Sequence, residues 1–72
     1  MAEEIRLLDV VALTEDVPAY ALVRGQVGTV VEALSDGVFE VEFSDDSGRT
    51  YAMVPLGPRQ MMVLRYERAH AA

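Results

Sequence analysis

The side chains best suited to chemistry in this sequence are carboxylates, and three of them lie in "VRGQVGTVVEALSDGVFEVEF", residues 23–43. Glu40 and Glu42 alternate with apolar residues, and Glu32 comes earlier in the same stretch. Two carboxylates can act as general acid and base where one of them is desolvated in a cleft. Strict alternation instead places Glu40 and Glu42 on one open strand face. The pattern therefore predicts no acid–base pair.

The other reactive residue types form no catalytic or metal-binding pattern. The chain has no Cys, and its one His, His70, stands in an Ala-rich tail with no residue to orient it as a base. The "DDSG" stretch at 45–48 lacks the spaced oxygens and the bidentate Glu of a calcium loop. The "GQVG" stretch at 25–28 lacks the lysine of a phosphate loop and opens no helix. We therefore expect no enzymatic activity, no cofactor and no metal site.

Charge narrows the class of partner. Twelve Asp and Glu residues oppose six Arg residues, and the net charge is −6. This charge disfavours phosphate backbones and anionic membranes, whereas basic or mixed protein surfaces remain suitable partners. Solubility alone also explains an acidic balance. The lack of Cys and of a long apolar run predicts a cytoplasmic protein with neither a signal peptide nor a membrane span.

A small all-β domain over residues 7–66 is expected to position these side chains, between flexible termini at 1–6 and 67–72. β-Branched apolar runs predict strands, and glycine turns predict two hairpins between the second strand and the fourth. Short strands in so small a chain predict a closed or half-open barrel, and closure would suit it because it removes exposed edges. The strands expected outside the hairpin turns are 7–13, 26–34 and 61–66.

Two segments are less regular. Residues 14–25 contain Pro18 and predict a long loop between the first two strands, pinned to the core by Val17, Tyr20 and Leu22. The run "RQMMVLRY" is compatible with a helix that starts after Pro58, but a strand is favoured because a barrel needs a closing element.

Alternation predicts the register of the first hairpin. A three-residue loop, 35–37, with Gly37 in the left-handed position of a type I turn, pairs Val31 with Val41 and Thr29 with Phe43. Gly28 inside the strand suggests a bulge, a bend or a close backbone approach. The inner face would carry Thr29, Val31, Ala33, Phe39, Val41 and Phe43. The outer face would carry Val30, Glu32, Glu40 and Glu42.

The second hairpin is predicted to turn through a four-residue loop, 45–48. This loop pairs Phe43 with Thr50 and Glu42 with Tyr51, and Pro55 is expected to end the pairing. The inner face would gain Thr50, Ala52 and Val54, and the outer face Arg49, Tyr51 and Met53.

The outer face of the two hairpins is the predicted binding surface. Glu32 would lie opposite Glu40, which is unfavourable while both are charged. Acidic residues around an exposed aromatic ring and a methionine suit an arginine-bearing partner. The alternative is a solvated face on which Arg49 offsets acidic repulsion. The same face, through Met53, Tyr51 and Val30, would also be the contact in a homodimer. The predicted contact residues are Glu32, Glu40, Glu42, Arg49, Tyr51 and Met53.

The blocks "LLDVVALTED", "VRGQVGTVVEAL", "FEVEF" and "GRTYAMVPL" together resemble an uncharacterised bacterial family of small SH3-like proteins. The resemblance covers residues 7 to about 64 and implies a five-stranded SH3-like barrel. The central block is also similar to KOW motifs and to the SH3-like domains of nitrile hydratase beta subunits. The family's genes often neighbour a toxin-like gene, which implies an antitoxin or immunity partner. Unlike RNA-binding KOW domains, this chain is acidic, and it lacks the Trp of proline-binding SH3 grooves.

These observations predict a non-enzymatic protein-interaction module, the antitoxin, immunity or accessory partner of a neighbouring gene product. A KOW-like nucleic-acid-binding domain and a small accessory subunit of an enzyme are the alternatives. A steep loss of affinity with added salt would favour the first alternative, and co-purification with an enzyme the second.

Overall fold

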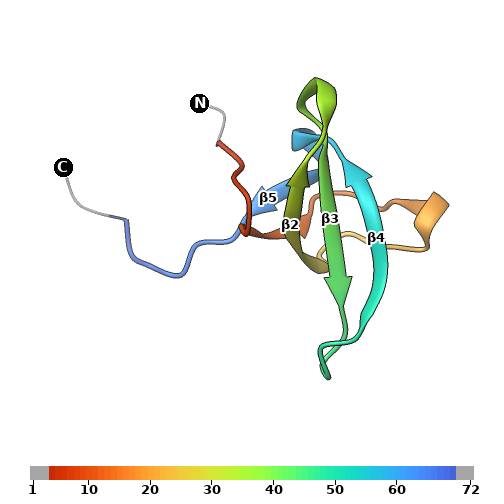
Figure 1. Cartoon of the computed structure of the whole chain (residues 1–72). Coiled ribbons are helices and arrows are strands. Elements are labelled where there is room, and N and C mark those ends of the chain that lie inside the picture. The colour runs from red at the N-terminus through yellow and green to blue at the C-terminus, as the bar shows by residue number, and fades with distance from the viewer. Residues whose placement is uncertain (1–3, 70–72) are drawn as a thin grey trace.

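The computed structural model describes residues 4–69 as five antiparallel strands in one sheet (Figure 1). The prediction of an all-β domain is confirmed, and the described residues contain no α-helix but three short 3₁₀ turns. The sheet order is β4-β3-β2-β1-β5, so β4 and β5 remain edges and the sheet is not closed into the predicted barrel. The strands are β1 (Val10–Leu13), β2 (Val27–Ala33), β3 (Phe39–Ser44), β4 (Thr50–Leu56) and β5 (Met61–Val63). The 3₁₀ turns are η1 (Pro18–Tyr20), η2 (Ser35–Gly37) and η3 (Pro58–Gln60).

The core is formed on one side of the sheet by side chains from every strand and from the long loop. Val30, Val41 and Val54 are directly paired across β2, β3 and β4, and all three are fully buried. Burial of a valine or leucine side chain stabilises a fold by about 1.5–3 kcal/mol. The buried core consists of Val11, Leu13, Val17, Leu22, Val30, Val41, Phe43, Val54, Leu56 and Met61.

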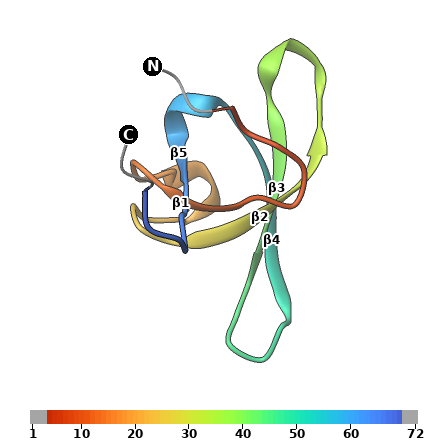
Figure 2. The ribbon, with the colours of Figure 1, turned by 90° about the vertical axis from the view of Figure 1, so that its left-hand side faces the viewer.

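Gly28 allows β2 to serve both halves of the sheet. It pairs with Val11 of β1 on one side and with Phe43 of β3 on the other. A Cβ atom at this position would lie 2.8 Å from the backbone oxygen of Glu42 and 2.8 Å from a methyl carbon of Val41. Of the three alternatives that the sequence left open, the structure selects close approach of the neighbouring strand. Figure 2 shows β2 alongside β1 at one end and alongside β3 at the other.

The first hairpin has the predicted three-residue loop at its tip but a different register beyond it. Ala33 pairs with Phe39, as expected, and a bulge follows between Val30 and Glu32. Val31 is the extra residue, so Val30 rather than Val31 pairs with Val41. The predicted positions of these two valines were therefore wrong: Val30 is 0% exposed and Val31 is 36% exposed. A bulge exchanges the faces of all residues on one side of it.

The bulge also moves Thr29, and the turn has a different type. Thr29 pairs with Glu42, so it lies on the outer rather than the inner face. Asp36 and Gly37 both have positive φ, 62° and 75°. Two consecutive positive φ values are the signature of a type I′ turn, for which Asp-Gly is favoured, and not of the predicted type I turn.

The second hairpin differs from its prediction in the same way. Its loop has three residues, because the Asp45 N–H donates to the Arg49 carbonyl, 2.9 Å away. Phe43 pairs with Ala52 and Ser44 with Thr50, so Tyr51 is a second bulge residue. The predicted pairs of Phe43 with Thr50 and of Glu42 with Tyr51 were wrong.

Pairing in this hairpin also continues through Pro55, which was expected to end it. Pro55 pairs with Glu40 and Leu56 pairs with Phe39. An edge strand accepts proline where the missing N–H would have pointed away from the sheet.

The first strand is shorter than predicted. Leu7 and Leu8 are exposed and precede β1, and Leu8 has a positive φ of 72°. The Asp9 carboxylate accepts a hydrogen bond from the Arg6 N–H at 2.9 Å, which forms a local turn instead of a strand.

The long loop and the last strand follow the prediction more closely. Val17 and Leu22 are buried and form an isolated bridge, whereas Tyr20 is about half exposed and does not pin the loop. The segment after Pro58 forms a strand, β5, which pairs with β1.

Candidate protein-binding surface

Four of the six predicted contact residues lie together on the outer face of β2, β3 and β4. Glu32 pairs directly with Glu40, and Glu42 pairs directly with Met53. Directly paired residues of antiparallel strands point to the same side, with Cβ atoms about 4.5–5.5 Å apart. Met53 is 47% exposed, so its thioether is available beside the carboxylates. We call this surface, formed by Glu32, Glu40, Glu42 and Met53, the acidic face.

The acidic face has no cationic partner among residues 4–69. The ion pair found within that range joins Arg6 to Glu4 at 3.5 Å and lies outside the face. Glu42 Oε2 instead accepts a hydrogen bond from the Thr50 hydroxyl. Glu32 and Glu40 therefore face each other as like charges, an arrangement that costs a few tenths of a kcal/mol or more, up to about 1 kcal/mol.

Arg49 is exposed and does not offset this charge through an ion pair in the described part of the chain. Its backbone N–H donates to Asp45 Oδ1 at 3.0 Å, in the turn between β3 and β4. The predicted compensation of the acidic repulsion by Arg49 is thus not formed in this structure.

Tyr51 lies on the opposite side of the sheet from the acidic face. Because Tyr51 is the bulge residue of β4, its ring is directed to the side of the buried Phe43, with ring centroids 6.3 Å apart and planes at 41°. Its hydroxyl accepts a hydrogen bond from Gln26 Nε2 at 3.0 Å. Half of the Tyr51 side chain remains exposed. Since Val30 is fully buried, Met53, Tyr51 and Val30 do not form the continuous dimer contact considered from the sequence.

An apolar row on the outer face was missed by the sequence reasoning. Val27 of β2 pairs with Ala12 of β1, which pairs with Met62 of β5. Val27 and Met62 are each about half exposed. Residues 10–13 and 61–63 are all apolar, so the sequence carried no alternation that would have revealed this row. In the structure Val11, Leu13 and Met61 are buried, so their neighbours face outward.

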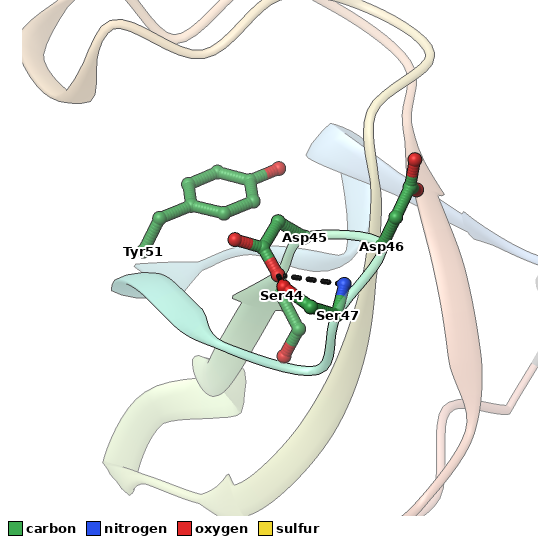
Figure 3. Close-up of a pocket in the computed structure, with 5 residues that line it drawn as sticks. All are labelled: Ser44, Asp45, Asp46, Ser47 and Tyr51. Atoms are coloured by element: carbon green, nitrogen blue, oxygen red, sulfur yellow. Dashed lines mark hydrogen bonds between the residues drawn. The ribbon is translucent and has the colours of Figure 1, made fainter.

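The turn after β3 holds its carboxylate by local hydrogen bonds (Figure 3). Asp45 Oδ1 accepts from the N–H and the hydroxyl of Ser47 and from the Arg49 N–H, each at 3.0 Å. These bonds, with that from Arg49 the largest contribution, lower the pKa of Asp45 below its ordinary value of 3.8. Asp46 points away from Asp45, so the two carboxylates do not converge (Figure 3). Within residues 4–69, no group of three or more His, Cys, Asp or Glu side chains could hold a metal ion.

His70 and parts of the predicted flexible termini, residues 1–3 and 70–72, lie outside the described residues. In the part of the chain that is described, no helix is long and apolar enough to cross a membrane.

The sequence matches a known family over residues 7–63, most of the chain and all five strands. That family is described as Domain of unknown function (DUF4926). The chain belongs to the DUF4926 family. Comparisons of this DUF4926 domain with curated proteins and with solved structures returned no match.

Proposed function

We propose that this DUF4926 protein is a non-enzymatic protein-interaction module, and that its acidic face binds a basic segment of a protein partner. The observation that carries the proposal is the direct pairing of Glu32 with Glu40, without a cation to offset it in the described residues. A basic partner would relieve this repulsion on binding, and complementary charge both speeds association and selects among partners.

Met53 supports the same surface. Its exposed thioether lies next to Glu42 and offers a flexible apolar contact beside the charges. Interfaces combine such an apolar contact with a polar surround. We further propose that the partner is a neighbouring gene product, for which this protein is the antitoxin, immunity or accessory component.

We also propose that the fold is SH3-like. Five antiparallel strands in the order β4-β3-β2-β1-β5, with a long connection after β1, support a half-open form of such a barrel. A fold of this kind carries many functions, so the proposed activity rests on the acidic face and not on the fold.

The experiment is affinity capture with the protein as bait, together with the co-expressed neighbouring gene product. A variant with Glu32→Gln, Glu40→Gln and Glu42→Gln removes the acidic face while it retains the shape of the side chains. A matched control removes the same charge elsewhere, at exposed carboxylates: Asp36→Asn, Asp46→Asn and Glu67→Gln. Circular dichroism confirms that all three proteins are folded.

We expect capture by the wild type and by the control, and its loss with the acidic-face variant. A partner retained equally by both variants would contradict the proposal and would move the site to another surface, such as the loop around Tyr20 and Arg24. Capture of nucleic acid alone, with a steep loss at higher salt, would instead favour a KOW-like function. An enzyme captured through another surface would favour an accessory subunit.

A further inference from the structure

The two edges of the sheet differ in length, and β4 is the longer one. It spans Thr50–Leu56 and contains no charged residue, whereas β5 spans only Met61–Val63. Long uncharged edges are templates for the addition of another strand, and proteins usually block them with charges, prolines or bulges. Here the bulge at Tyr51 and the proline at position 55 restrict the free part of the edge to residues 53–55.

The backbone groups that face away from β3 can be assigned from Pro55. Pro55 has no N–H, so its pair with Glu40 is one in which the two residues do not exchange hydrogen bonds. Alternation then directs the backbone groups of Val54 and Leu56 toward β3, and those of Met53 and Pro55 toward the edge. In residues 4–69, no backbone hydrogen bond joins Met53 or Pro55 to a segment other than β3. The edge therefore presents the Met53 N–H, the Met53 carbonyl and the Pro55 carbonyl. Figure 1 shows β4 beside β3 at this edge of the sheet.

The acidic face begins directly behind this edge. Met53 is paired with Glu42, and Pro55 is paired with Glu40. Neighbouring strands are about 4.8 Å apart, so an added strand would lie about 10 Å from β3. A lysine or arginine on its outer face would pass over Met53 or Pro55 toward Glu42 or Glu40, the residues with which Met53 and Pro55 are paired.

We infer that the β4 edge takes up an extended segment of the partner protein as a sixth strand, with Arg or Lys at alternate positions over Glu40 and Glu42. This inference rests on the proposed function of the acidic face and adds the mode of binding. Backbone hydrogen bonds to Met53 and Pro55 hold the segment, and the alternate side chains select it. A second copy of this chain is disfavoured as the occupant, because pairing of two β4 edges would bring two acidic faces together.

The test uses a short peptide of alternating Arg and Val, capped at both ends, and two forms of it that carry N-methyl groups. One form is methylated at every Arg nitrogen and the other at every Val nitrogen. The three peptides have the same charge and side chains, but each methylated form lacks the N–H groups along one of its two edges. Binding to the full chain is measured by calorimetry, and exchange of the Met53 amide hydrogen is measured by NMR.

We expect the unmethylated peptide to slow exchange of the Met53 amide by about tenfold or more at saturation. One methylated form should bind about tenfold or more weakly than the other, since it has lost several hydrogen bonds. Antiparallel addition places Arg nitrogens against β4 and predicts that the Arg-methylated form is the weaker one, whereas parallel addition predicts the reverse. The variant that combines Glu40→Gln with Glu42→Gln should bind all three peptides more weakly.

Equal affinity for the two methylated forms, with no slowing of exchange at the Met53 amide, would overturn strand addition. If binding were still weakened by Glu40→Gln and Glu42→Gln, the acidic face would remain a binding surface. If the Met53 amide of the free protein exchanged more slowly as the protein concentration was raised, a second copy of the chain would be the occupant of the edge. That result would also overturn the inference. Binding of all peptides that is insensitive to the glutamate variants would contradict the proposed function itself.

Discussion

The two hairpins, β2–β3 and β3–β4, each combine a short turn with a bulge, but the bulge has a different effect in each. Each turns through three residues that end in a glycine with positive φ, and each contains one bulge residue. In the first hairpin the bulge buries Val30 and leaves the bulge residue, Val31, 36% exposed, whereas in the second the bulge residue, Tyr51, packs against Phe43 and is still 49% exposed. The difference shows that the position of a bulge, more than the alternation of residue types, decides which side of the sheet each side chain faces.

Phe43 offers the largest test of this comparison, because it is flanked by Gly28 in the first hairpin and by Ala52 in the second. Gly28→Ala should lower the free energy of unfolding by about 3 kcal/mol, the upper end of the cost of overpacking, since the new Cβ would meet backbone at 2.8 Å. Ala52→Gly should cost only about 1 kcal/mol. Urea unfolding measures the loss of stability in both variants. A smaller loss for Gly28→Ala than for Ala52→Gly would contradict the close approach at Gly28.

The two turn glycines should respond alike, although the loops around them differ. Gly37 and Gly48 have φ of 75° and 83°, and a Cβ at either position would meet nothing within 4 Å. Gly37→Ala and Gly48→Ala should therefore each cost about 1–2 kcal/mol through backbone strain alone. The measurement is again urea unfolding, with each glycine replaced by Asn as a control that tolerates positive φ better. If only one alanine variant were destabilised, the two turns would not be equivalent.

In the second turn, the carboxylate of Asp45 accepts hydrogen bonds from the turn that follows it. Asp45→Ala removes an acceptor of three hydrogen bonds and should lower the melting temperature by a few degrees, at most about 8 °C, with Asp46→Ala as the near-neutral control. The pKa of Asp45 is below 3.8 in the folded protein, so its contribution is present above that value and is lost as the pH falls through the folded pKa. The difference in stability between wild type and Asp45→Asn should thus be constant from about pH 5 to 8 and shrink below about pH 4. A constant difference down to about pH 2 would argue against the lowered pKa.

The smallest expected effect concerns the two bulge residues themselves. Tyr51→Phe removes the hydrogen bond from Gln26 but keeps the contact with Phe43, so it should cost about 0.5–1 kcal/mol. Val31→Thr changes a solvent-directed residue and should alter stability by less than about 0.5 kcal/mol. Thermal unfolding of both variants, beside Val30→Thr as a buried control, sharpens the contrast. A larger loss for Val31→Thr than for Val30→Thr would indicate that the predicted register was right.

The sequence was a good guide to the elements because their signals are local. β-Branched runs marked the strands, and Gly37 and Gly48 marked the turns, because only glycine takes these backbone angles without strain. Gly28 was identified as a special position for the same reason. These features depend on the residue itself and on its nearest neighbours in the chain.

The two bulges were not predictable in the same way. Val30 and Val31 are the same residue type, so no local signal indicates which of them is buried, and the choice depends on the strands on either side. Pro55 was expected to end β4, because the sequence did not show that its N atom would face a free edge.

The same distinction separates the parts of the candidate site. Alternation along β3 places Glu40 and Glu42 on one face of the sheet. Pairing with the neighbouring strands then adds Glu32 from β2 and Met53 from β4 to the same face. Tyr51 is lost from the face through a bulge that alternation could not reveal.

The pairing of β1 with β5 has a mechanical consequence. Val11 pairs with Val63 and Leu13 with Met61, so the chain enters β1 and leaves β5 at the same end of this short ladder. Tension applied through the segments that flank β1 and β5 would load the ladder in unzipping geometry, so that the residue pairs open one after another. In shear geometry all the pairs would be loaded together. Within this ladder the pair of Val11 with Val63 would open before the pair of Leu13 with Met61, because it lies nearer to the point of loading.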